Sequence, residues 1–343
     1  MMASEKKKSK MPLTEIPSLA RSDEDGAEVF RKQYQQATIH QLHLGDSRNM
    51  SEVKSESVHL ILTSPPYWIL KKYNVVDGQL GSISEYQLFL EELGKAIREC
   101  FRVLVKGGRF ICVIGDVCRS RKENGEHMVV PLHSDITMTC RNIGFDNLTP
   151  IIWYKIANAC YEANTKSTIL GKPYEPNAVI KNDIEFILMQ RKPGSYRKVT
   201  DEQRLLSYIP RKCHEQWFKQ IWDIKGETTR RHPAPFPLEL ALRLVRMYSF
   251  VGDTILDPFL GTGTTTMAAL EAGRNSIGYE IDPSYLEIAR TRIQNSSSNI
   301  FWRSKIVTNA NASWIGKSST QVLCDSAANP LKSLANITRS KEL

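Results

Sequence analysis

The sequence predicts an α/β protein built on a mainly parallel sheet with helices on both faces. Short apolar runs that end in turns alternate along the chain with longer stretches of helical periodicity. The runs 57–62 (SVHLIL) and 110–114 (FICVI) are mostly apolar without alternation, as expected for strands that are buried on both faces. Because strands that alternate with helices form a parallel sheet with helical layers, this order predicts an α/β fold.

The expected elements follow one another along two blocks of the chain. The expected strands are 40–44, 57–62, 110–114, 148–153, 184–189, 254–256 and 275–279. The expected helices are 84–104, 131–143, 238–248 and a segment through 267–270. The first helix is expected to close at Gly107-Gly108, and 184–189 is expected to pair with 148–153 as a hairpin.

Composition divides the chain into five regions. We expect a polar, weakly ordered segment at 1–36, a first α/β half at 37–190 and a basic segment at 191–231. A second α/β half at 232–294 and a polar, Ser/Asn-rich tail without chemistry at 295–343 complete the chain. A length of 343 residues suits one large globular domain or one domain with a substantial insertion.

Several classes of protein are disfavoured by the composition. No apolar run reaches the roughly 18 residues that a membrane span needs, and the polar, lysine-rich beginning is unlike a secretory signal. These features predict a cytoplasmic protein. The seven cysteines form no C-x-x-C pair, so neither a zinc site nor a redox couple is expected, and no metal site is predicted.

The net charge of +9 is concentrated in one segment. Residues 191–231 hold eleven Lys and Arg against five Asp and Glu, which leaves +6 in this segment, and they also contain five Tyr, Trp and Phe residues. A basic segment with interspersed aromatic rings is typical of nucleic-acid binding, although a solvated surface would also explain the basic residues.

A nucleotide-type motif lies in the second half of the chain. A short strand runs into Asp257-Pro-Phe259-Leu-Gly261-Thr-Gly263, a helix follows, and the next strand ends at Glu280. The two glycines permit close approach of the backbone to a ligand, and a carboxylate at the strand end can accept both hydrogen bonds of a ribose diol. Thr266 stands where a dinucleotide motif has its third glycine, which favours S-adenosylmethionine over a pyrophosphate-bearing cofactor.

A second motif, Ser64-Pro65-Pro66-Tyr67, follows directly on the predicted strand 57–62. Consecutive prolines make a stiff turn, because φ is fixed and no N–H group is present. The outward carbonyls and the Ser64 hydroxyl can accept hydrogen bonds from an exocyclic amine, which makes the nitrogen lone pair more available for methyl transfer. Tyr67 can stack on a base that is turned out of a duplex.

Together the two motifs resemble the amino-methyltransferases of DNA modification, which carry (Asp/Ser/Asn)-Pro-Pro-aromatic and Phe-x-Gly-x-Gly motifs. The catalytic motif precedes the cofactor motif here, with a basic segment between them, which is the order of the β class of this family. The run His232-Pro-Ala-Pro-Phe-Pro237 also resembles a cofactor-side motif of that class. The resemblance covers about residues 38–294.

The resemblance implies a fold and a set of site residues. The fold would be the S-adenosylmethionine-dependent methyltransferase fold, a mixed, mainly parallel sheet of seven strands, with 191–231 as target recognition insertion. The catalytic residues implied are Ser64, Pro65, Pro66 and Tyr67, and the S-adenosylmethionine-binding residues implied are Asp46, Asp257, Phe259, Gly261, Gly263 and Glu280. The expected DNA-binding residues are Arg191, Lys192, Arg211 and Lys212.

The partners implied are double-stranded DNA and, where the enzyme belongs to a restriction–modification system of a prokaryotic cytoplasm, a restriction endonuclease that acts on the same site. Ser at the first catalytic position resembles the cytosine-N4 enzymes, whereas Asp resembles most adenine-N6 enzymes, so N4 is favoured and N6 is the alternative. Methylation of cytosine at carbon 5 is excluded. That reaction needs a thiolate nucleophile, which the carbon-5 enzymes place in a Pro-Cys dipeptide, and no cysteine here follows a proline. A nicotinamide-dependent oxidoreductase and a non-catalytic nucleic-acid-binding protein are more distant alternatives.

Overall fold

The computed structural model describes residues 37–71, 73–119, 125–155, 176, 180, 182–226, 236–296, 304–308 and 312–315. The predicted polar segment 1–36, most of the predicted tail and residues 232–235 of the proline-rich run lie outside the described residues. No helix of the described part is both long and apolar enough to cross a membrane.

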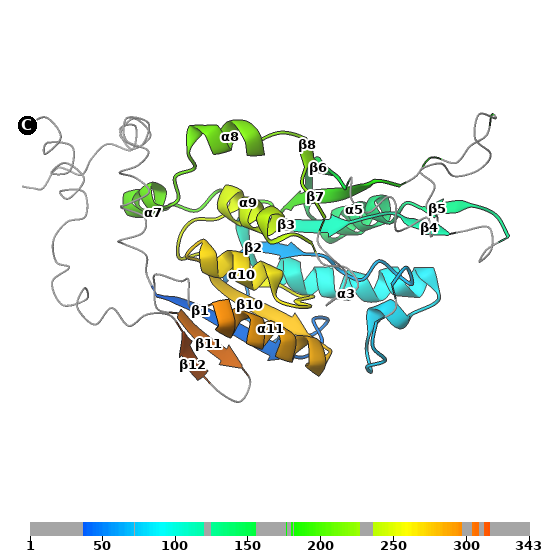
Figure 1. Cartoon of the computed structure of the whole chain (residues 1–343), viewed down its shortest axis with the longest axis horizontal. Helices are drawn as coiled ribbons and strands as arrows, with labels where there is room; N and C mark the ends of the chain where they lie inside the picture. Colours follow the sequence, from blue (N-terminus) through cyan, green and yellow to red (C-terminus); the bar gives the residue numbers. More distant parts are fainter. Residues whose placement is uncertain are drawn as a thin grey trace, which may run out of the picture.

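A central sheet of ten strands organises the described residues (Figure 1). In chain order its strands are β1 (Thr38–Leu44), β2 (Val58–Thr63), β3 (Leu104–Ile114), β6 (Asp146–Tyr154), β7 (Ile184–Arg191), β8 (Ile221–Asp223), β9 (Thr254–Asp257), β10 (Asn275–Glu280), β11 (Ser304–Thr308) and β12 (Ala312–Ile315). Their order across the sheet is β12-β11-β1-β10-β9-β2-β3-β7-β6-β8. A separate two-stranded sheet pairs β4 (Val117–Arg119) with β5 (Met128–Val130).

The sheet is mixed and mainly parallel, as the sequence predicts. Strands β11, β1, β10, β9, β2 and β3 pair in parallel, and β7 is antiparallel to both β3 and β6. The β6–β7 pairing confirms the predicted hairpin partners. The seven predicted strands form the centre, and β8, β11 and β12 extend the sheet at its two edges.

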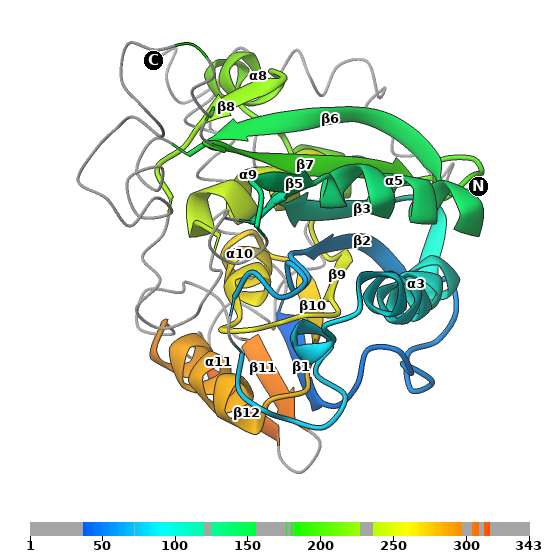
Figure 2. The same ribbon diagram turned by 90° about the vertical axis from the view of Figure 1, so that its right-hand side faces the viewer.

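Helices cover both faces of the sheet, and Figure 2 shows the two layers. Helices α3 (Tyr86–Val103) and α5 (Leu132–Ile143) pack on one face, and α9 (Leu238–Tyr248), α10 (Thr264–Glu271) and α11 (Pro283–Ser296) pack on the other. The side chains of successive residues of β2 point to opposite faces of the sheet, which explains why its sequence is mostly apolar without alternation. Ile61 packs with α3, whereas Leu60 and Leu62 pack with α9 and α10.

The glycine pair at 107–108 does not close the first predicted helix. The chain passes from α3 straight into β3 at Leu104, and both glycines lie within the strand. Gly107 adopts φ +74°, and a Cβ atom there would lie 2.9 Å from the Ser195 carbonyl oxygen. The glycines therefore permit a close passage of another backbone segment, a tertiary contact that helical periodicity could not reveal.

The basic segment is more ordered than the sequence predicted. It forms α7 (Asp201–Leu206), α8 (Arg211–Trp217) and β8, and both Trp217 and Trp222 are buried against α9. These two rings serve the core and are not free to stack on bases. The Trp222 Nε1 group donates to the Trp217 carbonyl oxygen at 2.9 Å, which fixes the turn between α8 and β8.

The predicted tail after residue 294 contains structure. Strand β11 pairs in parallel with β1, and β12 pairs antiparallel with β11. The run 304–308 is short and Ile306 is its one fully buried aliphatic residue, so the sequence signal of this edge strand was weak. Its position depends on a distant strand, β1, rather than on local pattern.

Candidate active site

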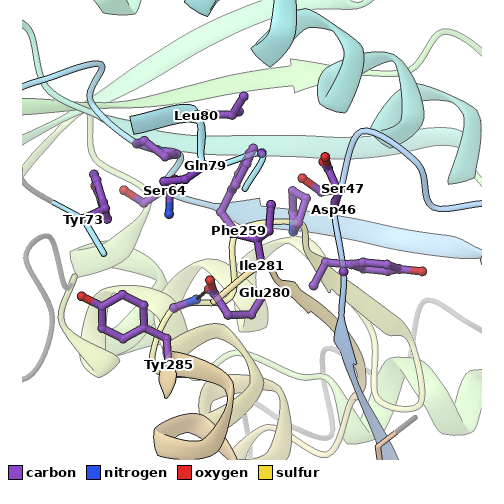
Figure 3. A pocket seen from close by; sticks show the side chains of 16 residues that line it. Asp46, Ser47, Ser64, Tyr73, Gln79, Leu80, Phe259, Glu280, Ile281 and Tyr285 are labelled. Atoms are coloured by element: carbon purple, nitrogen blue, oxygen red, sulfur yellow. Dashed lines mark hydrogen bonds between the residues drawn. The ribbon is translucent and has the colours of Figure 1, made fainter. Parts of the chain in front are cut away.

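One cavity lies at the carboxyl ends of four neighbouring parallel strands, β1, β10, β9 and β2. Ligands of open α/β sheets bind at this edge, because the loops that leave adjacent strands meet there. The residues that line the cavity are Gly45, Asp46, Ser47, Ser64, Pro66, Tyr73, Gly78, Gln79, Leu80, Pro258, Phe259, Gly261, Tyr279, Glu280, Ile281 and Tyr285. Figure 3 shows side chains of both predicted motifs around this one cavity.

Glu280 ends β10 and forms part of the cavity wall. Its side chain is 8% exposed, Oε2 accepts a hydrogen bond from Gly261 N at 2.7 Å, and Oε1 accepts one from Asp282 N at 2.9 Å. Burial raises its pKa to about 7. A carboxylate has about four acceptor positions, so acceptor capacity remains for a ligand. Gly261 has φ +52°, a left-handed conformation that favours glycine.

Asp257 lies behind the cavity and does not line it. Its side chain is 2% exposed, and Oδ1 accepts hydrogen bonds from Thr63 Oγ1 at 2.7 Å and Phe259 N at 3.1 Å. Burial raises its pKa to about 6. The structure therefore differs from the prediction of a direct cofactor contact, because this carboxyl group joins the end of β2 to the loop after β9 and holds the two predicted motifs together.

Gly263 also has a structural position. It precedes α10 with φ +81°, and a Cβ atom there would lie 3.2 Å from Ala289 Cβ of α11. Gly263 is absent from the cavity wall and permits close packing of two helices. Phe259 and Gly261, by contrast, line the cavity, and their contacts to the cofactor stay a prediction.

The proline turn contributes two of its four residues to the cavity, Ser64 and Pro66. Pro65 and Tyr67 are buried, and Tyr67 is 5% exposed, which leaves little ring surface for stacking on a base. Trp68 directly after the motif has φ +50°, an uncommon conformation for a bulky residue. Such backbone strain is found mainly at functional sites, where the surrounding structure enforces it.

A chain of polar side chains connects Ser64 to the β6–β7 hairpin. Ser64 Oγ donates to the Tyr67 hydroxyl at 3.4 Å, and the Glu185 carboxylate lies close enough to that hydroxyl to raise its pKa. Lys155 forms an ion pair with Glu185. Burial and then the charge of Glu185 raise the pKa of Tyr67 well above its usual value, so its hydroxyl keeps its proton. Glu185 is not predicted from the sequence, because it lies far from Ser64 along the chain.

Asp46 lines the cavity and is held by Arg48. Its Oδ1 accepts from Arg48 N at 2.9 Å, and Oδ2 accepts from Arg48 Nη2 at 2.5 Å. The same guanidinium forms an ion pair with Glu92 of α3. Arg48 was not predicted, although a basic residue two positions after a site carboxylate is a usable signal in the sequence.

Most of the other residues missed by sequence analysis come from two segments. Tyr73, Gly78, Gln79 and Leu80 belong to the stretch that leads into the short helix η1 (Leu80–Ser82), and Ile281 and Tyr285 follow Glu280. Apolar and aromatic residues directly after an acid that ends a strand indicate a surface on which a ligand ring can pack. The sequence around Tyr73 and Gln79 contains no comparable signal, because these residues follow no element with a recognisable periodicity.

The charge of the cavity wall discriminates among cofactors. Asp46 and Glu280 line it, and among the described lining residues none is Lys or Arg. A pyrophosphate would meet two carboxylates, and the nearby Arg48 is already paired with one of them, Asp46, whereas a ribose diol and a cationic centre would be accommodated. The residues therefore fit S-adenosylmethionine and disfavour a nicotinamide dinucleotide.

The predicted DNA-binding residues do not gather at this edge. Strand β7 pairs Phe186 with Ile114 near the cavity and Arg191 with Arg109 at the other end of the sheet. Arg191 is paired with Asp146. Lys192 is 8% exposed and donates to the Leu104 carbonyl oxygen at 2.8 Å, so its prediction as a DNA contact is wrong.

Arg211 and Lys212 begin α8, at the surface. Arg211 forms an ion pair with Glu215, and Arg197 of the same basic segment pairs with the buried Asp253. The excess of positive charge counted in the sequence is therefore partly compensated within the fold.

Comparisons with known proteins agree with this geometry. The model of the DNA methylase family, the N6/N4 methyltransferases, matches residues 58–291. The chain is 38% identical over 286 residues to the type II methyltransferase M.MjaI of Methanocaldococcus jannaschii, covering 75% of this chain and 91% of that protein. It is 35% identical over 283 residues to M.MthZI of Methanothermobacter thermautotrophicus, covering 76% of this chain and 78% of that one.

Solved structures show the same fold. TTHA0409 of Thermus thermophilus, solved in complex with S-adenosyl-L-methionine, is 47% identical with a TM-score of 0.65, covering 79% of this chain and 99% of that one. The cytosine-N4-specific PvuII DNA methyltransferase is 19% identical with a TM-score of 0.55, covering 75% of this chain and 87% of that one, and this likeness concerns the fold alone. The chain therefore belongs to the DNA methylase family of N6/N4 amino-methyltransferases, enzymes that use S-adenosylmethionine.

Proposed function

We propose that the chain transfers the methyl group of S-adenosylmethionine to the exocyclic N4 amine of cytosine in duplex DNA. One observation carries the proposal. Ser64, rather than an acid, lines the same cavity as Glu280 and Gly261. A neutral hydroxyl that accepts a hydrogen bond next to the cofactor position suits an amine that needs orientation and no prior deprotonation.

The cofactor side of the cavity supplies binding and orientation. S-adenosylmethionine, when bound, provides a methyl group on a sulfonium centre. We assign the ribose diol to Glu280, and the adenine to the wall that includes Asp46, Phe259 and Ile281. Gly261 positions the Glu280 carboxylate through its backbone N–H group.

The proline turn supplies the acceptors for the target amine. Ser64 Oγ directs its own hydrogen toward Tyr67, so its lone pairs are free to accept a hydrogen from the amine. The Glu185 carboxylate beside Tyr67 can accept the hydrogen of the Tyr67 hydroxyl, which favours this direction of the chain. The proton lost from the amine after transfer can leave along the same hydrogen bonds, or directly to water.

Support for a role in modification comes from the relatives. M.MjaI and M.MthZI are named type II methyltransferases. We therefore propose that the chain modifies a specific DNA site, in a restriction–modification system with an endonuclease for the same site. The exposed pair Arg211 and Lys212 is proposed to contact DNA phosphates.

The experiment uses purified full-length protein, labelled S-adenosylmethionine and duplex DNA, followed by hydrolysis of the product to nucleosides. We expect N4-methylcytosine. N6-methyladenine alone would overturn the choice of base and leave the enzyme class intact, an outcome for which the 28% identical DNA adenine methyltransferase YhdJ of Escherichia coli is a precedent. Methylation at cytosine carbon 5 would contradict the mechanism.

A further inference from the structure

A second cleft lies at the end of the sheet opposite the catalytic cavity. It is lined by the beginning of β3, the segment 196–218, the last turn of α9 and residues 249–253. The β3–β7 register places this end at Arg109 and Arg191, whereas Ile114 and Phe186 lie at the catalytic end. In Figure 1, α7 and α8 lie toward the left, at the end of the sheet where β1 begins.

The cleft has the dimensions of a ligand site. Its volume is about 520 Å³, within the range of roughly 300–1,000 Å³ that small-molecule sites occupy. Its walls are fixed by interactions between distant parts of the chain. Val251 N donates to Ser207 Oγ at 2.8 Å, and Gly107 N donates to the Lys192 carbonyl oxygen at 2.9 Å.

The charge of this cleft is the reverse of that of the catalytic cavity. Its described lining contains Lys106, Arg109, Arg197 and Arg246 as cations and, among those residues, Asp253 as the only acid. Asp253 is already paired with Arg197. None of the other three cations forms an ion pair with a described residue, and Arg246 Nη2 has no hydrogen-bond partner among them. An anionic ligand would compensate this charge.

Aromatic rings accompany the cations. Tyr196 is 66% exposed and Phe218 is 45% exposed, and both line the cleft. The Arg109 guanidinium lies 4.8 Å from the centre of the Tyr248 ring. Exposed rings beside guanidinium groups are the side-chain set on which nucleic-acid bases stack while their phosphates are held.

We propose that this cleft binds a nucleoside phosphate at a site separate from the cofactor cavity, with the phosphate held by Lys106 and Arg109 and the base stacked against Tyr196 or Phe218. The ligand is a free nucleotide or an unpaired nucleotide of a nucleic-acid strand, since both present the same chemistry. The proposal does not depend on which base the enzyme methylates, because none of the residues that line this cleft lines the catalytic cavity.

The test is calorimetric titration of the full-length protein saturated with S-adenosylhomocysteine, which fills the catalytic cavity. The probes are ATP, a short single-stranded oligothymidylate and inorganic triphosphate. We expect ATP or the oligothymidylate to bind more tightly than inorganic triphosphate, and the probe that binds identifies the source of the nucleotide. The Lys106→Ala/Arg109→Ala variant should weaken this binding at least about tenfold, since two charge-assisted contacts are lost.

The matched control is Arg98→Ala/Arg141→Ala, which removes the same charge from exposed positions on α3 and α5 outside the cleft. It should bind the probe as the wild type does. Tyr196→Ala should weaken ATP or oligothymidylate and leave inorganic triphosphate unchanged. Absence of binding by every probe, equal loss in the control variant, or inorganic triphosphate binding as tightly as ATP would overturn the proposal. Retained affinity for S-adenosylhomocysteine in each variant shows that the protein is folded.

Discussion

The two ends of the sheet carry opposite chemistry on one scaffold. Among the described residues, the catalytic cavity at the carboxyl ends of β1, β10, β9 and β2 is lined by two acids and by no Lys or Arg, and one of the acids, Asp46, is paired with Arg48. The second cleft is lined by four Lys and Arg and by one acid, which is paired with Arg197. A cationic cofactor and the proposed anionic ligand would therefore bind at separate places. Among the described residues, the larger group of cations lies away from the catalytic cavity.

The two ends also differ in how the chain builds them. The catalytic cavity arises from loops that directly follow parallel strands, so its residues come from motifs that are short in sequence. The second cleft, at the far end of the sheet, depends on β7, which runs antiparallel to β3 from the catalytic end to the opposite end. It also depends on the segment of α7 and α8, which lines the cleft together with the beginning of β3. Substitutions at one end are expected to leave the other unaffected, and the following predictions test that independence.

The largest effect is expected from Ser64→Ala. Loss of the hydroxyl removes an acceptor for the target amine, and we expect kcat for methyl transfer to fall about 100-fold or more. The affinity for S-adenosylmethionine should remain unchanged, because the cofactor is held by other residues. Single-turnover kinetics and equilibrium dialysis measure the two quantities. The matched control is Ser207→Ala in the far cleft, for which a comparable loss of kcat would break the comparison.

Glu280→Ala is expected to lower cofactor affinity at least about tenfold, because one or two charge-assisted hydrogen bonds of roughly 1.5–3 kcal/mol each are lost. Equilibrium dialysis measures the affinity. Glu287→Gln on α11 changes an exposed carboxylate nearby and should leave the affinity unchanged. An unchanged dissociation constant for Glu280→Ala, together with normal melting, would place the cofactor elsewhere.

Cofactor binding should also depend on pH through Glu280, whose pKa burial raises to about 7. The carboxylate form accepts the diol hydrogens, so affinity should rise as the pH increases through 7. The free energy of unfolding of the ligand-free protein should change in the opposite direction. The buried carboxyl group binds its proton more tightly than the same group does in the unfolded chain. The free energy of unfolding therefore falls as the pH rises from 4.5 to 7. Glu280→Gln should abolish the pH dependence of cofactor affinity and reduce that of the free energy of unfolding, to which Asp257, whose pKa burial also raises, still contributes. Dialysis and chemical denaturation across a pH series measure the two quantities.

A smaller effect is expected from Glu185→Gln, which weakens the acceptor that orients Tyr67 and, through it, Ser64. We expect kcat to fall about tenfold with little change in KM for DNA. Tyr67→Phe should give a similar loss, and the two substitutions together should cost little more than either alone, because they interrupt one chain. Additive losses would show that Glu185 acts independently of Tyr67. Glu239→Gln, an exposed acid of α9, is the control.

The smallest effect is expected from Arg211→Ala/Lys212→Ala on α8. If both residues neutralise phosphates, the log-log salt dependence of DNA binding should become shallower by up to about two units. Filter binding over a salt series gives the slope, with the Arg98→Ala/Arg141→Ala variant as the charge-matched control. Cofactor affinity should not change. An unaltered slope would mean that DNA does not reach this part of the far end.

The sequence alone determined the sheet centre and the position of the chemistry. Buried strands such as β2 and β3 are apolar on both faces, and the turns that follow β2 and β9 have fixed residue types, so local pattern is sufficient there. Ser64, Phe259, Gly261 and Glu280, which the sequence singles out, therefore line one cavity.

Tertiary structure alone decided which of these residues form the cavity wall and which support it. The carboxyl group of Asp257 is predicted from the sequence to contact the cofactor, and only the neighbouring strand β2 shows that it bonds to Thr63. Lys192 counts as positive charge in the sequence, yet its ammonium group is buried against the Leu104 carbonyl. The position of Glu185 and the lining of the second cleft both depend on the antiparallel pairing of β7 with β3. One physical reason explains why the sequence does not reveal the roles of these polar residues. Hydrogen-bond partners distant along the chain set the role of a polar side chain, and residue spacing carries no record of them.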